Sequence, residues 1–565
     1  MPNAVKYKAG NLTGSIQKGN VALAVNDIVG PTSTTGWYNG PNFTQGTYQI
    51  IETAATGDPD IFCPQNDAEL IKFVRWKGAT GSNTGSVGAA LAWIATQPNL
   101  LAVNEVYPNI VTSGSLLNLD AQFVGSYPTT ESTWYDVSGN NNNGSLVNGP
   151  TFNNAGYITF DGIDDACNFP VRTFNTGSPQ QGTFYIRMKF PTLNTGSPTI
   201  LFYDGGASNN LIYLYRNPVF NVNHYSWLIY STGSTGQGFY LQGTTYLPGR
   251  WYDTTFTFVN TGTGSIYRNG ELINSSATVG GGNFISWNRT GNNAPALNPA
   301  SALGTGSAQL FQWYNRALTQ AEILQNYYQG PIVTDGLVLA LDAGNLVSYE
   351  SGSTTTYSMT GSLTGSLLNG VGYLPSYGGT WNFDGVDDYI EFPFETILND
   401  CSFEVWFKAT STRTYQYPLA IRNNGVGSSY AFYLDINDPD GNGFAQTMWV
   451  YWNSGGTPYS VVPKTGTYGD WNDSTWRHYV FTRSTTVAPY TEHYMNGVKV
   501  TNVSRNGDQT TQFGNGTGYK LYLGQYGAGA LYYPGYQAIV RIYNKTLSSA
   551  EVAQNYNATK GRFGL

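Results

Sequence analysis

Short runs of apolar and aromatic residues alternate with polar turns along most of the chain. Runs such as Phe184–Phe190, Phe403–Lys408 and Tyr479–Thr482 are rich in aromatic and β-branched residues, and apolar positions recur in part at every second residue. This period is typical of half-buried strands. Gly, Asn, Ser and Thr cluster between the runs, where tight turns favour them. The pattern predicts a mainly β protein.

The chain also repeats itself. Phe160–Asp165 returns as Phe383–Asp388, and Tyr314–Leu318 returns as Tyr543–Leu547, with further matching segments in the same order between them. A long ordered repeat of this kind indicates two homologous domains that follow a different N-terminal one. We therefore divide the chain into three domains: residues 1–111, 112–331 and 332–565.

Each repeat carries a turn signal and a helix signal at equivalent places. Asn269-Gly270 and Asn496-Gly497 are typical of type I′ hairpin turns, because both residues tolerate a positive φ. Thr319–Glu322 and Ser548–Glu551 are capping boxes, which predict a helix near the end of each repeat.

The first 111 residues have a different pattern. Asn66–Trp76 has the caps and apolar spacing of a helix, and Val87–Ala95 is apolar enough for a helix or a buried strand. We expect a small mixed α+β domain here, with apolar area left over for a partner.

Charge and cysteine content exclude several classes of protein. Among 565 residues only 11% are charged, the net charge is −8, and no basic cluster suits nucleic acid. No stretch approaches the roughly 18 apolar residues of a membrane span, and Met1–Tyr7 lacks the apolar core of a secretion signal. Cys63, Cys167 and Cys401 lie far apart, so we expect buried free thiols.

Four ordered segments of the second repeat resemble the concanavalin A-like, laminin G-like jelly-roll family; they are Phe383–Ile390, Trp476–Val480, Tyr494–Gly497 and Arg541–Glu551. The first repeat is similar but departs further from the pattern. The resemblance implies two tandem antiparallel jelly-roll β-sandwiches. It also implies a role in binding glycans or protein surfaces, in some members with calcium as a cofactor.

Ala68–Trp76 and Gln554–Phe563 also resemble segments of structural proteins of tailed bacteriophages, especially those that infect cyanobacteria. This resemblance implies a fibre, spike or decoration subunit located on the virion and synthesised in the host cytoplasm. Its N-terminal domain would attach to other virion proteins, its sandwiches would bind a host surface glycan, and we expect a homo-oligomer.

An enzyme is not indicated. Glycoside hydrolases of this sandwich type carry Glu-x-Asp-x-x-Glu along one strand, and no such run occurs here. Glu404 is the one carboxylate on the strands richest in aromatics. His224, His478 and His493 are too scattered to predict a nucleophile–base pair.

Two kinds of acidic loop could supply oxygen ligands to calcium. The loop from Asp438 begins like an EF-hand, but its twelfth position is Trp449 instead of Glu. The other kind, Asp-Gly-x-Asp-Asp, occurs in both repeats, and its carboxylates could equally serve as turn residues that accept backbone N–H bonds. The candidate metal ligands are Asp435, Asp438, Asp440 and Asn442 in the first kind, and Asp161, Asp164, Asp165, Asp384, Asp387 and Asp388 in the second.

Sugar recognition needs exposed aromatic rings flanked by polar groups. Aromatic side chains are plentiful here, and half of those on any sandwich strand face the core. The candidates are Trp449, Tyr451, Trp452, Tyr415, Tyr417 and Tyr533. The favoured hypothesis is a non-enzymatic virion protein with lectin-like domains. A secreted or cell-surface carbohydrate-binding adhesin and a degraded glycoside hydrolase are the alternatives.

Overall fold

The structure is a computed structural model in which the chain divides into two compact units, Met1–Gly330 and Pro331–Leu565. For β1–β7, β15–β18, β22 and β33 only the backbone is described. The described residues are 4–7, 17–18, 21–22, 28–29, 48–52, 61–64, 81, 89, 93, 100–103, 109–123, 126–127, 132–161, 163–168, 181–189, 200–205, 211–216, 225–230, 238–241, 246–259, 264–276, 296–297, 306–396, 398–411, 413, 415–423, 430–438, 447–452, 459–462, 475–501, 503–506, 518–527, 531–563 and 565.

The N-terminal part of the first unit forms an antiparallel sheet. The predicted helix at Asn66–Trp76 lies outside the described residues, as does most of Val87–Ala95, so the mixed α+β character and the boundary after residue 111 stay predictions. The sheet has the strand order β4 (Ile28–Val29), β5 (Tyr48–Glu52), β6 (Ile61–Pro64), β1 (Ala4–Tyr7) and β7 (Leu100–Val103), while β2 (Gln17–Lys18) pairs with β3 (Val21–Ala22).

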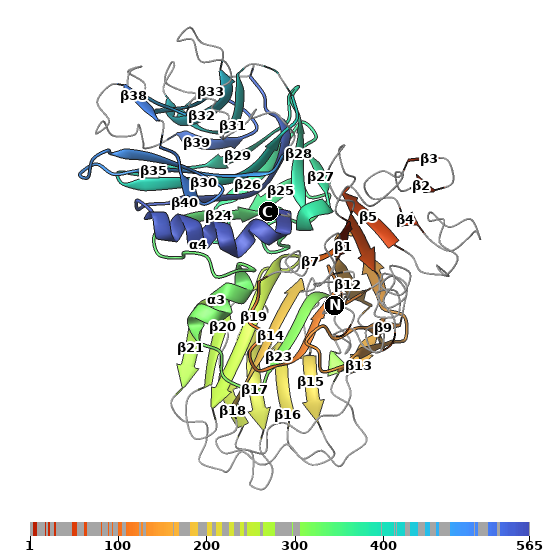
Figure 1. The fold of residues 1–565 in the computed structure, drawn as a ribbon. Coiled ribbons are helices and arrows are strands. Elements are labelled where there is room, and N and C mark those ends of the chain that lie inside the picture. Colours follow the sequence, from red (N-terminus) through yellow and green to blue (C-terminus); the bar gives the residue numbers. More distant parts are fainter. Residues whose placement is uncertain are drawn as a thin grey trace. The chain divides into compact units, whose positions relative to one another are not determined.

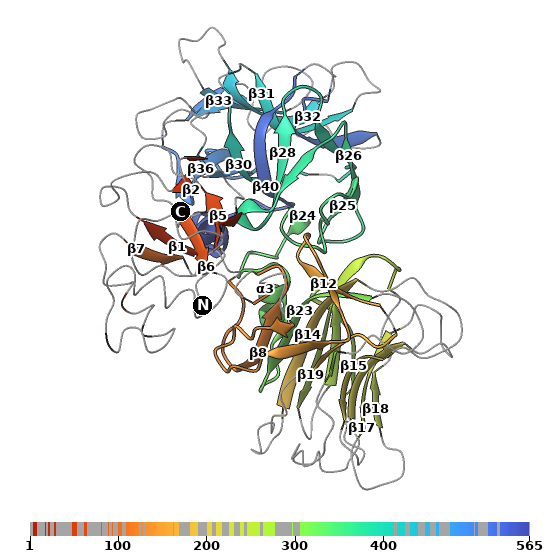
Figure 2. The same cartoon turned by 90° about the vertical axis from the view of Figure 1, so that its right-hand side faces the viewer.

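The rest of the first unit is a sandwich of two antiparallel sheets, as predicted. Figure 2 shows β14, β19 and β23 side by side in the sheet that also contacts helix α3; we call it the helix-side sheet. Its order is β11 (Thr151–Asn153), β12 (Tyr157–Phe160), β23 (Gly306–Tyr314), β14 (Gln181–Lys189), β19 (Trp251–Val259), β20 (Gly264–Arg268) and β21 (Glu271–Ser276), with β8 (Ser115–Asp120) also paired to β23. The other sheet, the distal sheet, has the order β18 (Gly238–Leu241), β17 (Tyr225–Tyr230), β16 (Leu211–Arg216), β15 (Ile200–Gly205), β22 (Ala296–Leu297), β13 (Ala166–Asn168), β10 (Gly144–Val147) and β9 (Thr133–Trp134).

The second unit repeats this sandwich. In Figure 1 its helix α4, drawn in blue, lies against β24 and β40 of the same unit. The helix-side sheet has the order β27 (Gly372–Leu374), β28 (Thr380–Asp384), β40 (Pro534–Tyr543), β30 (Cys401–Ala409), β35 (Arg477–Arg483), β36 (Thr491–Met495) and β37 (Val498–Lys499), with β24 (Leu337–Asp342) also paired to β40. The distal sheet has the order β25 (Thr355–Tyr357), β26 (Thr364–Leu368), β29 (Tyr389–Pro393), β39 (Tyr519–Leu523), β31 (Gln416–Asn423), β32 (Tyr430–Asp438), β33 (Thr447–Trp452), β34 (Tyr459–Val462) and β38 (Ser504–Asn506).

Alternation along each strand explains the core. On β30, Phe403 and Val405 face the distal sheet, and the Phe403 ring stacks on Phe432 of β32 with centroids 4.0 Å apart. Glu404 and Trp406, at the positions between and after them, lie on the other face, where α4 covers the sheet. Cys167 and Cys401 are buried free thiols in the two sandwiches, as predicted.

The predicted local signals are confirmed. Both capping boxes are formed, at the N-termini of α3 (Gln320–Tyr327) and α4 (Ser549–Thr559). Asn269-Gly270 and Asn496-Gly497 have positive φ at both residues, as a type I′ turn requires. Two 3₁₀ turns also lie in the second unit: η3 (Ser376–Gly378) and η4 (Lys560–Phe563).

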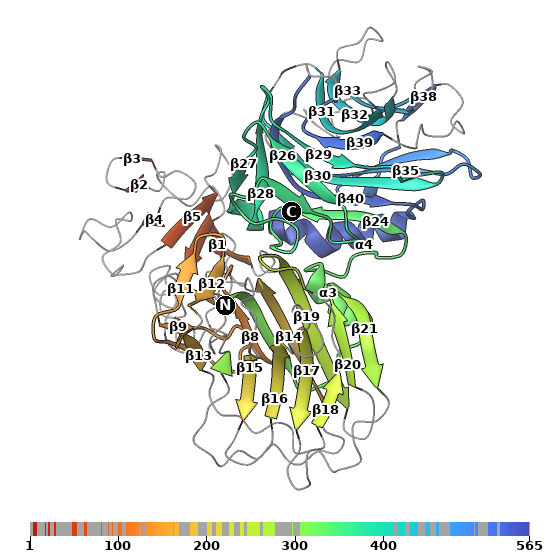
Figure 3. The same cartoon turned by 180° about the vertical axis from the view of Figure 1, so that it is seen from behind.

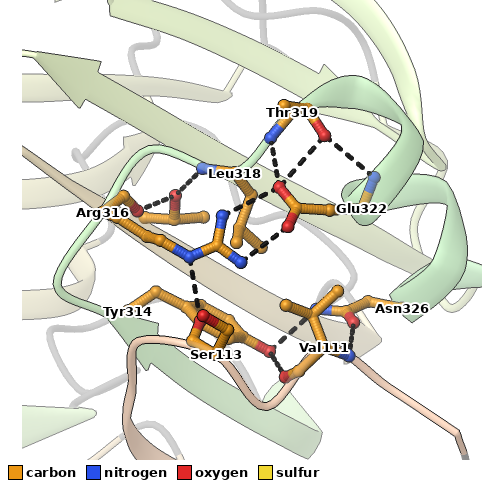
Figure 4. Close-up of polar contacts among 9 residues, drawn as sticks. Val111, Ser113, Tyr314, Arg316, Leu318, Thr319, Glu322 and Asn326 are labelled. Carbon is orange, nitrogen blue, oxygen red and sulfur yellow. Dashed lines mark hydrogen bonds and ion pairs between the residues drawn. The ribbon is translucent and has the colours of Figure 1, made fainter.

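A buried asparagine joins each terminal helix to the beginning of its sandwich. In the first unit the Asn326 side chain accepts the Val111 N–H at 2.9 Å and donates to the Tyr314 hydroxyl at 2.9 Å. That hydroxyl donates to the Val111 carbonyl at 3.0 Å, which closes a ring of hydrogen bonds (Figure 4). Beside it, Arg316 pairs with Glu322 of the capping box and donates to the Ser113 carbonyl.

The second unit has the same ring. Asn555 accepts the Val333 N–H at 2.8 Å and donates to the Tyr543 hydroxyl at 2.8 Å. It also donates to Glu404 at 2.7 Å. One amide therefore satisfies a backbone group, a phenol and a carboxylate, each of which is buried and costly to leave unpaired.

We expect Asn555→Ala to lower the free energy of unfolding of the second unit by about 2–4 kcal/mol, because the Val333 N–H and Glu404 both lose a buried partner. Urea unfolding of the full chain, read by hydrogen exchange in β30 and β40, measures the loss. Asn557→Ala, at an exposed site of the same helix, is the control. Equal effects of the two substitutions would contradict the role assigned to Asn555.

Candidate functional site

The distal sheet of the second unit carries a second set of side chains on the face away from its core. On β31 and β32, Leu419, Ile421 and Leu434 belong to the core. Arg422 and Tyr433 occupy alternate positions on the opposite face. Figure 3 shows β31, β32 and β33 side by side, so residues opposite one another on these strands lie in rows across the sheet.

One such row is rich in tyrosine. Its members are directly opposite one another on successive antiparallel strands, so the row crosses the sheet in register. In register order it runs Glu391, Tyr522, Ala420, Tyr433, Tyr451 and Tyr459.

Tyr526 packs over this row. Its ring centroid lies 4.8 Å from that of Tyr417 and 5.2 Å from that of Tyr433, and the Arg422 guanidinium lies 4.7 Å from its centre. Tyr433, Tyr526 and Arg422 are half-buried, whereas Tyr522 is buried beneath them. We call Tyr389, Tyr417, Tyr433, Tyr522 and Tyr526 the tyrosine face.

Charged groups border the tyrosine face. Lys520 pairs with Glu391 at 2.9 Å. Burial, together with the Glu391 carboxylate, raises the pKa of Tyr522 to about 12, and the same causes raise the pKa of Tyr389. Both phenols are therefore protonated at neutral pH and able to donate hydrogen bonds.

Three predicted sugar-stacking residues lie on β33. Trp449 and Tyr451 are opposite Asp435 and Tyr433, at register positions of the tyrosine face. Trp452 is opposite Phe432, a core residue, so its register position is on the core side. The sequence pattern could not separate these three, because the face of a strand residue depends on its register.

The other three predicted aromatic residues have different surroundings. Tyr415 is half-buried, with a φ of 59°. Tyr417 is buried and supports Tyr433 and Tyr526 from the side. Tyr533 is fully buried against Phe383, so its prediction as a sugar-stacking ring is wrong.

Tyr433, Tyr526 and Arg422 are not among the residues predicted from the sequence. The alternation of Tyr430–Asp438, with apolar Phe432 and Leu434 on one side, already places Tyr433 on the opposite face. Nothing local indicates Tyr526, which reaches the face through a turn after β39.

The twin acidic loops bring their carboxylates together. In each of the triplets Asp161/Asp164/Asp165 and Asp384/Asp387/Asp388, the ligand oxygens lie within 4.8 Å of one another. Burial and the neighbouring carboxylates raise the pKa of the third aspartate in each, Asp165 and Asp388.

Backbone groups already use these carboxylates. Asp161 accepts the Ile163 N–H at 2.7 Å, and this bond lowers its pKa. Asp384 accepts the Val386 N–H at 2.7 Å. The turn role considered from the sequence is thus present in both repeats, and calcium binding by these oxygen-rich clusters stays a prediction.

The second predicted calcium loop is only partly within the described residues. Asp435 lies inside β32, is buried and accepts the Gln416 N–H at 3.1 Å. It therefore lies in a strand and not in the predicted loop, and its role as a calcium ligand stays a prediction. Asp438 ends β32 opposite Thr447, and Asp440 and Asn442 lie outside the described residues.

Glu404 is enclosed beneath α4. It contacts Arg541 at 2.5 Å and His478 at 3.2 Å, and accepts from Asn555. Although burial raises the pKa of a carboxyl, Arg541 and these hydrogen bonds hold that of Glu404 at about 2. The group is an ionised anchor with no exposed surface, which is unsuited to proton transfer with a substrate.

The structure brings one histidine to a serine, contrary to the sequence expectation. His493 Nε2 lies 2.7 Å from Ser460 Oγ, and its Nδ1 lies 2.7 Å from the Tyr479 hydroxyl. These groups link β36 of the helix-side sheet to β34 of the distal sheet, and all three are buried. Within the part of the chain that the structure describes, the cluster is therefore a buried hydrogen-bonded link between the two sheets.

Burial, with the Arg505 guanidinium nearby, lowers the pKa of His493 to about 3. Folding therefore favours the neutral His493 ring. The stability that it contributes is fully present above pH 6.5, the pKa of an unburied histidine, and is lost as the pH falls towards 3.

We expect the free energy of opening β36 to fall by about 1.4 kcal/mol per pH unit across this range. Hydrogen exchange of the β36 amides in the full chain measures this slope. His493→Gln should flatten it, and an unchanged slope in that variant would contradict the assignment.

None of the helices in the described part of the chain is both long and apolar enough to cross a membrane.

Comparison with known families finds one match. The family described as the concanavalin A-like lectin/glucanases superfamily, laminin G type, matches residues 161–324 and 384–553. The two segments correspond to the two sandwiches and together make up more than half of the chain. No curated protein sequence is similar enough to count as a relative.

Several solved structures are similar to the chain at low identity and low TM-score. The binding domain of paraclostridial mosquitocidal protein 1 is 12% identical, with a TM-score of 0.32, and covers 80% of this chain and 96% of its own. The botulinum neurotoxin serotype D ligand binding domain in complex with N-acetylneuraminic acid is 10% identical, with a TM-score of 0.33, over 73% of this chain and 96% of its own. Domain 4 of AbnA, an arabinanase from Geobacillus stearothermophilus in complex with arabinotriose, is 16% identical, with a TM-score of 0.28, over 40% of this chain and 98% of its own. At these scores the ligands of those proteins carry no argument about this one.

Proposed function

Because the chain belongs to the concanavalin A-like lectin/glucanases superfamily, we propose that it is a non-enzymatic, lectin-like protein that binds glycans through the tyrosine face. The observation that carries this proposal is the register row of tyrosines on the distal sheet of the second unit. Partly open rings beside polar groups are what sugar recognition requires, since the apolar face of a sugar stacks on the ring while its hydroxyls need donors and acceptors.

The row also suits an extended glycan. Neighbouring strands lie about 4.8 Å apart, so the positions of the row follow one another at regular intervals across the sheet. Glu391 and Lys520 provide polar groups beside one end of the row.

The non-enzymatic part of the proposal is supported by the surroundings of the reactive groups. Glycoside hydrolysis needs two carboxylates that face a common cleft. Glu404 is ionised and enclosed beside Arg541, Asp435 of β32 is buried against the Gln416 backbone, and the His493–Ser460 pair is buried between the sheets.

We further infer that the protein is a virion component, a fibre, spike or decoration subunit. The support is the resemblance of Ala68–Trp76 and Gln554–Phe563 to phage structural proteins, together with the low charge and polar surface composition. In this arrangement residues 1–111 attach to other virion proteins, and the sandwiches bind the host surface.

A glycan array probed with the full chain tests the binding proposal. We expect at least one polysaccharide to bind without release of new reducing ends, and Tyr433→Ala to weaken binding by about tenfold, because a central tyrosine contributes over 1 kcal/mol to an interface. Tyr490→Ala, in a half-buried turn of the helix-side sheet, is the matched control. Absence of binding across the array, or equal losses in the two variants, would refute the proposal.

Immunogold labelling of purified particles tests the location. A virion protein gives labels at a fixed site on the particles and at a constant copy number. Labels confined to the surface of cells would instead support a secreted or cell-surface adhesin. Deleting residues 1–111 should abolish labelling of particles if that segment provides attachment.

A further inference from the structure

Two cations lie directly opposite one another beside the tyrosine face. Arg422 on β31 pairs in register with Lys520 on β39, on the face away from the core. Like charges at opposite positions of an antiparallel pair repel and destabilise it. The placement is notable in a chain with only 27 Lys and Arg among 565 residues.

One of the two cations lacks a counter-charge. Lys520 pairs with Glu391 at 2.9 Å. Among the residues that the structure describes, Arg422 has no carboxylate partner, and its buried Nε has no hydrogen-bond acceptor. Because the guanidinium is only half-buried, an anion that approaches its other N–H groups would form a charge-assisted hydrogen bond with a cation that has no counter-charge.

The guanidinium is also held in place. The Tyr526 ring lies 4.7 Å from it, which fixes its plane by a cation–π contact, and Tyr522 lies beneath the same turn. A planar guanidinium offers paired N–H groups whose spacing matches a carboxylate or sulfate. The position of the Arg422 guanidinium therefore suits the binding of one small oxyanion at the end of the tyrosine face.

We propose that Arg422, with Lys520, binds the carboxylate or sulfate of an acidic sugar residue, so that the ligand of the tyrosine face is an acidic glycan. This inference rests on the proposed glycan-binding function and specifies its ligand class. Glu391 beside Lys520 repels a second negative group, so the site selects sparsely charged chains over dense polyanions.

The test uses matched pairs of glycans on one array. Each acidic oligosaccharide is printed beside its neutral form: oligogalacturonate with its carboxyl-reduced product, and a sulfated galactan with its desulfated product. The full chain is compared with Arg422→Gln and with Lys499→Gln, which removes one charge from an exposed edge of the helix-side sheet.

We expect the wild type to prefer the acidic member of at least one pair by about tenfold, the size of one charge-assisted hydrogen bond. Which pair shows the preference distinguishes a carboxylate from a sulfate. Arg422→Gln should bind both members of the pair alike, while Lys499→Gln keeps the preference. The melting temperature of Arg422→Gln should not fall, because the substitution removes the charge opposite Lys520.

Two results would overturn the inference. If the wild type binds the acidic and neutral members equally, the proposed anion-binding subsite is refuted, but the glycan-binding proposal still holds. A preference that persists in Arg422→Gln would assign the selectivity to other residues. If no glycan binds in either form, the proposed function itself fails.

Discussion

A single buried asparagine side chain closes each sandwich. Asn326 and Asn555 bind the backbone just before the first strand of their sandwiches and the tyrosine at the end of the last strand. The segments they join are more than 200 residues apart in the chain. Bringing such distant segments together costs conformational entropy. The hydrogen bonds of the asparagine ring offset this cost only when every buried polar group in the ring has a partner. The position of the helix, and hence of everything packed under it, depends on this ring.

The two sheets of the second sandwich place their polar side chains in different surroundings. The helix-side sheet buries its polar residues under α4, where Glu404 and Arg541 neutralise each other in a dry environment. The distal sheet keeps its tyrosines and Arg422 on a face that no helix in the described part of the chain covers. On the distal sheet, Arg422, Tyr433 and Tyr526 are only half-buried.

Local features of this fold could be predicted from the sequence, and features that depend on register could not. The capping boxes and Asn-Gly turns are confirmed because their hydrogen bonds join residues at most a few positions apart. Tyr533 was predicted to be open and is buried, while Tyr433 was overlooked. The error for Tyr533 arises because a run of aromatics does not reveal which residue a strand places on which face. For Tyr433 the alternation of its strand was sufficient to place it away from the core. The contact of His493 with Ser460 joins two different sheets, so no spacing along the chain indicates it.

The two repeats have diverged most where their buried charges lie, and this bears on how a tandem protein folds. In the first unit Tyr185 and Arg187 surround Asp253, and Gln312 faces them from the last strand. In the second, Glu404 requires Arg541 from its own last strand. Exchange of last strands between repeats would put an extra buried cation beside Arg187 and leave Glu404 without its guanidinium. Breaking a buried ion pair costs about 3–5 kcal/mol. Homologous neighbours on one chain are prone to swap segments during folding, and here each sheet accepts only its own final strand.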